Sequence, residues 1–189
     1  ISKNERLSSV EHENIYFWPY YQEFTEKARN MMNDKKKNRV ILHFDISDYY
    51  DNISIPRLLE IVRSNNKESE NIKYNFDKET INLISEVYSK ISNGEKGIPQ
   101  TDNNIVSSFI GNLYMMFADL FTQDILNKRP EILSHNLIRY VDDTYISIDL
   151  RKSINDYERD KISMEIAQRV AELVSNKLGL RVNPKSRLY

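Results

Sequence analysis

The sequence predicts an α+β fold built on one antiparallel β-sheet with helices on one face. Its 189 residues, 40% of them apolar, suffice for one domain of ordinary size. Short β-branched runs alternate with longer amphipathic stretches, in the order strand, helices, strand, strand, helix, strand. With 4 Gly and 5 Pro, the chain has no linker-like stretch that would divide it. This order of elements is that of a split βαβ, or ferredoxin-like, sheet.

Composition excludes several classes of function. Lys and Arg total 27 against 28 Asp and Glu, so the formal net charge of −1 supplies no general attraction for polyanions. The absence of Cys removes disulfides, cysteine zinc sites and thiol nucleophiles, and the 3 His form no pair at helical spacing, so a zinc enzyme is not expected. No apolar run reaches the roughly 18 residues of a membrane span, and no signal peptide is recognisable. We therefore expect a cytoplasmic protein without a membrane partner. The chain opens at Ile1 rather than Met and ends within a predicted strand, so we also expect a segment of a longer protein.

The first predicted elements are a helix and a buried strand. Apolar and aromatic residues recur every three or four positions between residues 15 and 32, which predicts an amphipathic helix. Residues 39–45 (RVILHFD) form a short β-branched run that ends in an acid. The strand therefore delivers the carboxylate of Asp45 at its C-terminal end.

Two helices are predicted to follow this strand. Ser54 offers a side-chain cap and Pro56 suits a first helical turn, which predicts a helix over residues 55–63. After a polar loop, Asp77 caps a second helix over residues 78–91, whose apolar residues share one face.

A long apolar helix and a hairpin form the centre of the predicted domain. Residues 104–127 are apolar on most of the helix circumference, so this helix is expected to lie in the middle of the domain. Strands over residues 136–141 and 144–150 follow, and Asp142-Asp143 is the only point between them where a tight turn fits. The predicted turn therefore consists of two acids.

The last predicted elements complete the sheet. Apolar positions between residues 156 and 178 indicate an amphipathic helix that Gly179 ends, and a strand follows over residues 180–182. In this topology the strand that ends at Asp45 lies beside the acidic hairpin, although the two are far apart in the sequence.

The converging carboxylates indicate metal chemistry. Hard divalent cations prefer carboxylate oxygens, and two such ions about 4 Å apart activate a 3′-hydroxyl and stabilise a leaving pyrophosphate. The alternative is that the acids are solvated caps of strand ends and turns, where Asp is common. Their joint occurrence with the motifs below favours the metal site.

Four segments resemble the motifs of one family in the family's order. Residues 44–53 (FDISDYYDNI) resemble motif A of the reverse transcriptases, residues 97–114 (GIPQTDNNIVSSFIGNLY) motif B, residues 139–146 (RYVDDTYI) the YxDD-bearing motif C, and residues 178–186 (LGLRVNPKS) motif D. The bacterial members, which include the retron, group II intron and phage-defence enzymes, are the most similar.

This resemblance implies a domain organisation. Residues 39–189 would form a polymerase palm with motifs A to D, interrupted by a helical finger insertion at about 55–96. Residues 1–38 would form a helical segment on the finger side, and a thumb is absent from the sequence. The segment alone is therefore expected to grip a duplex poorly and to be inactive by itself.

The resemblance also implies roles for the acids. Asp45 and Asp142 would bind two Mg²⁺ ions, for which Mn²⁺ can substitute, and Asp143 would assist them. The carbonyl of Ile46 would be a further ligand. Lys185 matches the motif D lysine, whose ammonium would protonate or stabilise the departing pyrophosphate, with a solvated surface lysine as the alternative.

A second group of residues would contact the nucleotide and the primer. Tyr50 matches the bulky aromatic residue that excludes a ribose 2′-hydroxyl, although the adjacent Tyr49 competes for this role and a buried core tyrosine is the alternative. Gln100 matches the motif B glutamine near the incoming nucleotide and template, or else belongs to a polar loop. Tyr140 and Val141 resemble the residues on which the primer end rests, or else pack within the strand.

Motif B departs from the family pattern. Thr101 occupies the position where the family usually has Gly, and Ser107-Ser108 stands where a Ser-Pro pair is usual, with two extra residues before it. We therefore expect the loop over the nascent base pair to differ from that of the family.

The function that follows is nucleotidyl transfer by an RNA-directed DNA polymerase, with a role in antiphage defence as one setting. The expected partners are an RNA template, a DNA or RNA primer, dNTPs and a second copy of the chain. Two alternatives remain open, namely untemplated or protein-primed synthesis and a palm scaffold that binds nucleic acid without polymerising. A palm-type cyclase is disfavoured, because its Gly-Gly-Asp/Glu-Glu-Phe hairpin is missing.

Overall fold

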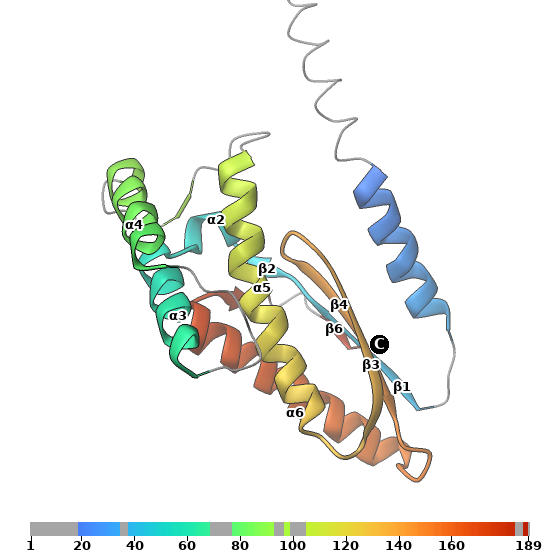
Figure 1. Cartoon of the computed structure of the whole chain (residues 1–189). Coiled ribbons are helices and arrows are strands. Elements are labelled where there is room, and N and C mark those ends of the chain that lie inside the picture. The colour runs from blue at the N-terminus through green and yellow to red at the C-terminus, as the bar shows by residue number, and fades with distance from the viewer. Residues whose placement is uncertain are drawn as a thin grey trace, which may run out of the picture.

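The computed structural model describes residues 19–34, 38–68, 77–92, 97–98, 105–183 and 187–188. Within these ranges the chain forms one four-stranded sheet, a second sheet of two short strands, and helices that pack around them (Figure 1).

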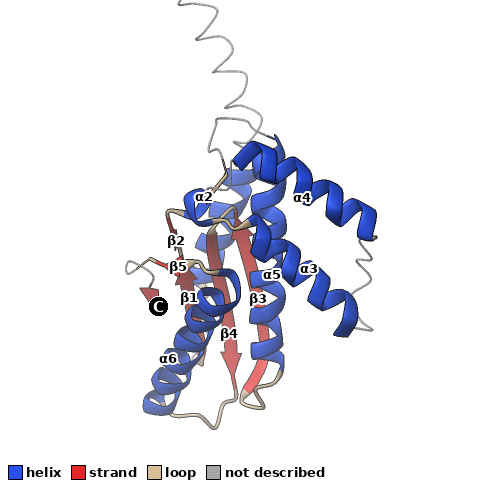
Figure 2. Ribbon diagram, turned by 90° about the vertical axis from the view of Figure 1, so that its left-hand side faces the viewer, coloured by secondary structure: helices blue, strands red, loops and turns tan. Residues whose placement is uncertain are grey.

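The main sheet is antiparallel throughout and contains the two strands that the sequence places at the centre. Strand β1 (Arg39–Phe44) pairs on one side with β4 (Asp143–Leu150) and on the other with β6 (Arg187–Leu188). Strand β3 (Ile132–Tyr140) pairs with β4 and lies at the edge, giving the order β3-β4-β1-β6. The predicted split βαβ topology is thus confirmed, and β1 lies directly beside the hairpin (Figure 2). Its last strand is β6, however, and the strand predicted over residues 180–182 belongs to a second sheet.

The small sheet extends the end of β1 toward the C-terminal part of the chain. Strand β2 (Ile46–Ser47) follows β1 after Asp45 and pairs with β5 (Arg181–Val182), in the register Ile46 to Val182. The end of β1 is therefore held from two directions, by the hairpin and by the segment around β5.

Two helices cover one face of the main sheet. Helix α5 (Ile105–Asn127) contacts β3, and α6 (Asp156–Leu173), which continues as the π-helical turn η1 (Val174–Leu178), contacts β1. Alternate strand residues point into this layer, because successive side chains of a strand point to opposite faces. The core between the sheet and the helices contains Leu42, Phe44, Ile146, Ile148, Tyr114, Met115, Ile166, Val170 and Leu178.

The end of η1 shows why the chain needs glycine there. Gly179 has a φ of +69°, and a Cβ atom added to it would lie 2.6 Å from Nη1 of Arg57. The left-handed conformation favours glycine, whereas the Arg57 guanidinium is the end of a flexible side chain that can move away, and the position of Gly179 confirms the predicted helix end.

The other face of the sheet carries a helix that the sequence analysis did not assign to it. The helix over residues 19–33 packs with Phe24 against Tyr140 and Tyr145, at ring-centroid distances of 5.7 Å and 5.9 Å. Ala28 and Met31 of this helix are buried as well. Figure 1 shows this helix and α5 on opposite sides of the β3–β4 hairpin.

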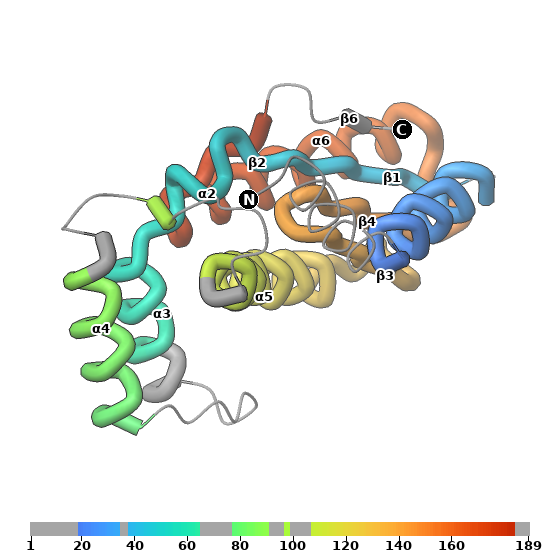
Figure 3. Tube along the Cα trace, turned by 90° about the horizontal axis from the view of Figure 1, so that it is seen from above, coloured from blue at the N-terminus to red at the C-terminus, as the bar shows by residue number. Residues whose placement is uncertain are grey.

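Two further helices stand beside α5. Helix α3 (Ile55–Glu68) packs against α4 (Lys78–Ser92), and Figure 3 shows the pair on the side of α5 away from the helix over residues 19–33. Asp77 caps α4 as predicted, since its Oδ1 accepts a hydrogen bond from the Thr80 amide at 2.7 Å. The assignment of this pair to a finger insertion stays a prediction.

Helix α3 is longer than the sequence predicts. It continues through the polar residues after Arg63, which the sequence analysis assigned to a loop. Polar residues can continue a helix without an apolar pattern, so the loss of that pattern in the sequence did not mark the end of the helix. In the parts of the chain that the structure describes, no helix has the length and apolar character needed to cross a membrane.

Candidate active site

The hairpin turn is shifted by one residue from the predicted one. Tyr140 pairs with Asp143, so the two loop residues are Val141 and Asp142, and Asp143 is the first residue of β4. Val141 has a φ of +55°, which is the conformation that a two-residue hairpin turn requires and that a β-branched residue rarely adopts. The prediction of a turn made of Asp142-Asp143 was therefore wrong, because it placed both acids in the loop.

The three acids approach one another at the end of β1 and the tip of the hairpin. Burial raises the pKa of the Asp142 carboxyl, and the negative charges of Asp45 and Asp143 raise it further, while its own backbone amide opposes the shift. The negative charges of Asp45 and Asp143 therefore affect the Asp142 carboxyl, which is partly buried.

Two of the acids are hydrogen-bonded to protein groups. Asn183 donates from Nδ2 to Oδ2 of Asp45 at 2.9 Å, and from its backbone amide to the Asp45 carbonyl at 2.6 Å. Asp143 lies with its Oδ1 2.5 Å from Nε2 of His43. Within the described ranges, no three His, Cys, Asp or Glu side chains are grouped closely enough to hold a metal ion. The acids are thus neighbours, and Asp45 and Asp143 each have a protein partner.

His43 and Asn183 are site residues that the sequence analysis did not identify. The His43 ring stacks on Tyr145 with a centroid distance of 4.3 Å and an interplanar angle of 11°, and the two residues are register partners in β1 and β4. Asn183 lies inside the segment that resembles motif D, which was the one available signal for it.

The two tyrosines of motif A occupy different environments. Both belong to the short helix α2 (Tyr49–Asn52). Tyr49 is 4% exposed and donates a hydrogen bond to the Gly111 carbonyl of α5 at 2.5 Å. Tyr50 is half-buried, and its pKa is raised by burial and by the charge of Asp142, while a hydrogen bond with Ser108 opposes the shift. Burial raises the pKa of Tyr49 most and the charge of Asp142 raises it as well, so both tyrosines lie within reach of that charge. Tyr49 belongs to the core, and Tyr50 is the one with a partly exposed ring.

Gly111 allows these tyrosines to approach α5 closely. A Cβ atom at this position would lie 3.3 Å from the Tyr49 hydroxyl and 3.4 Å from a ring carbon of Tyr50. The position of Tyr50 therefore depends on one turn of α5.

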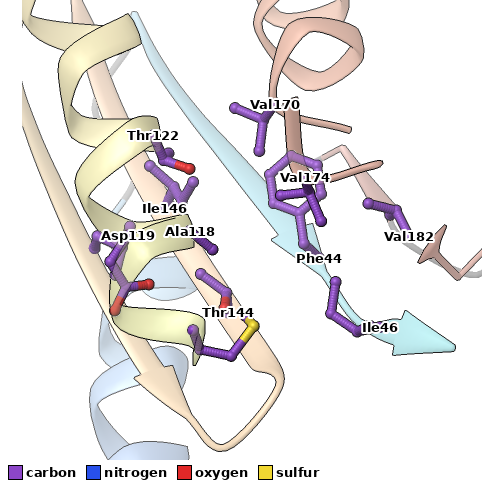
Figure 4. A pocket seen from close by; sticks show the side chains of 12 residues that line it. Phe44, Ile46, Ala118, Asp119, Thr122, Thr144, Ile146, Val170, Val174 and Val182 are labelled. Atoms are coloured by element: carbon purple, nitrogen blue, oxygen red, sulfur yellow. The ribbon is translucent and has the colours of Figure 1, made fainter. Parts of the chain in front are cut away.

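Ile46 contributes its side chain to the core below the acids. It is buried and lines an interior cavity of about 20 Å³ between the sheet, α5 and η1 (Figure 4). Thr144, which follows the acids on β4, also lines this cavity, and its buried hydroxyl has no hydrogen-bond partner among the described residues. The cavity is large enough for about one water molecule.

Tyr140 connects the hairpin to the helix over residues 19–33. Its ring lies 5.3 Å from that of Tyr21 in an edge arrangement and also contacts Phe24. Val141 forms the tip of the hairpin beside it. Gln100 and Lys185, the two remaining predicted site residues, lie outside the described residues, as does Thr101.

The antiparallel sheet is backed by two helices and carries acids where its central strands end. This arrangement defines the palm class of polymerase domains. Solved structures show the same fold. The apo telomerase from Candida tropicalis truncated from its C-terminal domain matches with a TM-score of 0.53 and 17% identity, covering 100% of this chain and 35% of that one. The telomerase from Candida albicans in complex with a TWJ fragment of telomeric RNA matches with a TM-score of 0.52 and 13% identity, covering 100% of this chain and 30% of that one. The chain thus spans about a third of the length of these structures.

The model of the family described as reverse transcriptase (RNA-dependent DNA polymerase) matches residues 4–186. The chain therefore belongs to the reverse transcriptase family, as its four motifs predict. No curated protein sequence matches it. Its likeness to the bacterial members stays a prediction.

Proposed function

We propose that this chain forms the catalytic palm of an RNA-directed DNA polymerase, which adds dNTPs to the 3′-hydroxyl of a DNA or RNA primer on an RNA template. The observation that carries this proposal is the proximity of Asp45, which follows β1, to Asp142 in the turn of the neighbouring β3–β4 hairpin. One acid follows β1 and the other lies in the turn of the hairpin beside it, which supports a joint role of both at one substrate.

The acids suit a pair of Mg²⁺ or Mn²⁺ ions. Carboxylate oxygens are the ligands that these cations prefer. Burial raises the pKa of Asp142, and the like charges of Asp45 and Asp143 raise it further, a repulsion that a bound cation would relieve. Asp45 and Asp142 would hold the ions, with Asp143 and the Ile46 carbonyl as further ligands. When bound, the ions would lower the pKa of the attacking hydroxyl and neutralise charge on the leaving pyrophosphate.

The chain's own residues would orient the nucleotide. Tyr50 is partly exposed and lies within reach of the charge of Asp142, which supports a role for its ring against the sugar of a nucleotide held there. Gln100 would contact the incoming nucleotide and template, and Lys185 would stabilise the leaving pyrophosphate. Tyr140 and Val141 would support the primer end. Catalysis would rest on positioning and charge, with no covalent intermediate.

One observation favours a second candidate, a palm scaffold that binds nucleic acid without polymerising. Asp45 and Asp143 are hydrogen-bonded to Asn183 and His43, so a cation would have to displace these contacts or share the carboxylates with them. We rank this second, because all three acids are present. Self-association, the cytoplasmic location, the antiphage setting and the division into palm and fingers remain parts of the proposal.

A polymerase assay on the full-length protein tests the proposal. The assay measures Mg²⁺- or Mn²⁺-dependent dNTP incorporation on poly(rA)/oligo(dT), beside a reaction without template and primer and beside Asp142→Asn. Template-dependent product that Asp142→Asn loses would support the polymerase. Product without template would indicate untemplated or protein-primed synthesis, and a lack of product in every reaction would favour the scaffold.

A further inference from the structure

The side chain of Arg139 links the acidic hairpin to α5. Its Nε donates to the two carboxylate oxygens of Asp119 at 2.9 Å and 3.1 Å, and its Nη2 donates to Oδ1 of Asn112 at 3.0 Å. Its Nη1 donates to the backbone carbonyl of Val141 at 2.9 Å. A single planar guanidinium thus binds the helix and the turn together, which a lysine with one nitrogen cannot do.

The contact with Val141 holds a strained part of the hairpin. Val141 has a φ of +55°, where a β-branched side chain meets its own backbone, so this conformation persists only when its surroundings impose it. The Arg139 guanidinium binds the Val141 carbonyl through its Nη1. The next residue is Asp142, so the orientation of this turn sets the direction of its carboxylate.

The contacts with α5 reach the same part of the helix that supports Tyr50. Asn112 follows Gly111, whose carbonyl accepts the Tyr49 hydroxyl and whose Cα side faces the Tyr50 ring. Asp119 lies two turns further along the same helix face, and Figure 4 shows its side chain projecting from α5. One rigid helix therefore contacts both the tyrosine pair and the guanidinium.

The ion pair itself is a weak candidate for a purely stabilising role. The Arg139 and Asp119 side chains are 12% and 18% exposed. Ion pairs with this little exposure often add little net stability compared with apolar residues of the same size, because both charges lose water. The pair of Arg139 and Asp119 then matters mainly because it fixes the position of the guanidinium.

We propose that Arg139 is a positioning residue, which fixes the turn that carries Asp142 relative to α5 and therefore relative to Tyr50. This inference rests on the proposed function for its effect on catalysis. Its structural part, that the guanidinium holds the turn, stands independently of any activity.

Two variants separate positioning from stability. Arg139→Lys keeps the charge beside Asp119 but cannot reach all three acceptors. Asn112→Ala removes one hydrogen bond of an exposed side chain and leaves the ion pair intact, so the protein will fold. The matched control is Arg129→Lys, since Arg129 also joins two acids, Glu131 at 2.9 Å and Glu165 at 3.1 Å, at the other end of the sheet.

The first readout is amide hydrogen exchange at residues 140–143 in the full-length protein without metal. We expect exchange there to become about tenfold faster in Arg139→Lys, several-fold faster in Asn112→Ala, and unchanged in Arg129→Lys. Unchanged exchange in both Arg139→Lys and Asn112→Ala would overturn the proposal, whatever the activity of these variants.

The second readout is dNTP incorporation as a function of Mg²⁺ and dNTP concentration. We expect Arg139→Lys to lower kcat by about ten- to a hundredfold and to raise the Mg²⁺ concentration for half-maximal rate, with a thermal midpoint close to that of Arg129→Lys. A loss of rate that follows only the loss of folded protein would show a merely structural role and contradict the proposal. If the wild type is inactive while the exchange result holds, the proposed function fails and the role of Arg139 in holding the turn stands.

Discussion

Nε2 of His43 lies 2.5 Å from Oδ1 of Asp143, so the second acid of the hairpin has a partner on the neighbouring strand. The stacked ring of Tyr145 holds the imidazole in this orientation. Asp143, to which the proposed function gives a part in metal binding, therefore also belongs to the cross-strand contacts between β1 and β4.

His43→Phe tests this contact. The phenyl ring can keep the stack on Tyr145 but leaves Asp143 without its partner, so we expect the free energy of unfolding to fall by about 1 kcal/mol. Urea denaturation measures the change, and Asp143→Asn in the wild-type and variant backgrounds completes a double-mutant cycle. Strictly additive effects in that cycle would show that the two side chains do not stabilise each other.

Asp142→Asn is expected to have opposite effects with and without metal. Without metal, the variant removes one of three mutually repelling acids, so its thermal midpoint in EDTA should rise above that of the wild type. With Mg²⁺ at 100 times its dissociation constant, the wild type should gain about 2.7 kcal/mol and the variant less. Thermal denaturation in EDTA and in Mg²⁺ measures both. An equal Mg²⁺ gain in both proteins would remove Asp142 from the metal site.

Tyr50→Ala and Tyr49→Phe form a pair with different expected outcomes. Removal of the Tyr50 ring should admit ribonucleotides, because this ring is the partly exposed one of the two within reach of Asp142. Tyr49→Phe loses only the hydrogen bond to Gly111, so it should cost about 1 kcal/mol of stability and leave sugar discrimination unchanged. Competing dNTP and rNTP incorporation by the full-length protein measures the first effect, and urea denaturation the second. If sugar discrimination instead changed in Tyr49→Phe alone, the gate would belong to Tyr49.

Asp77 gives α4 a stability that depends on pH. Its pKa is lowered, first by the hydrogen bond from the Thr80 amide and then by the Thr80 hydroxyl. A carboxyl with a lowered folded-state pKa stabilises the fold above its unfolded value, and this contribution is lost as the pH falls through the folded value. The loss therefore falls below about pH 4, the ordinary range of an Asp carboxyl.

Asp77→Asn is the matched variant, because Asn caps helices about as well as Asp but does not titrate there. We expect wild type and Asp77→Asn to have similar α4 protection at neutral pH, and the wild type to lose more as the pH falls below about 4. Asp77→Ala should be weaker at every pH. Hydrogen exchange of the α4 amides, read as the difference between variants at each pH, measures this. A pH-independent difference between wild type and Asp77→Asn would contradict it.

The order of strands and helices could be predicted because hydrophobic periodicity and caps are local properties of the sequence. The meeting of Asp45 with the hairpin followed from the topology alone. Local sequence patterns do not show which side chains meet between separate elements. They could therefore not predict the contact of Arg139 with Asp119 or that of His43 with Asp143. The turn was misplaced by one residue for a related reason: a Gly or Asn would have marked the left-handed position, whereas Val141 adopts it through its surroundings.

The choice between Tyr49 and Tyr50 also required the structure. Both are large aromatic residues after the same acid and both approach α5 at Gly111, and only the direction of α2 decides which hydroxyl is buried against the Gly111 carbonyl and which ring stays partly exposed. Similarity to motif A identified the segment that contains Tyr49 and Tyr50 but could not distinguish between these two residues.

The pairing of β1 with β4 has a consequence for how the protein folds. Phe44 pairs with Thr144, so the central contact of the sheet joins residues that are separated by most of the domain. Contacts between distant parts of a chain form slowly, because a long loop must close before they give any stability. During synthesis β1 emerges well before the hairpin and waits several seconds for its partner at about 5–20 residues per second. The acids at the end of β1 and at the hairpin tip therefore come together late, and until then the edges of β1 are open to mispairing.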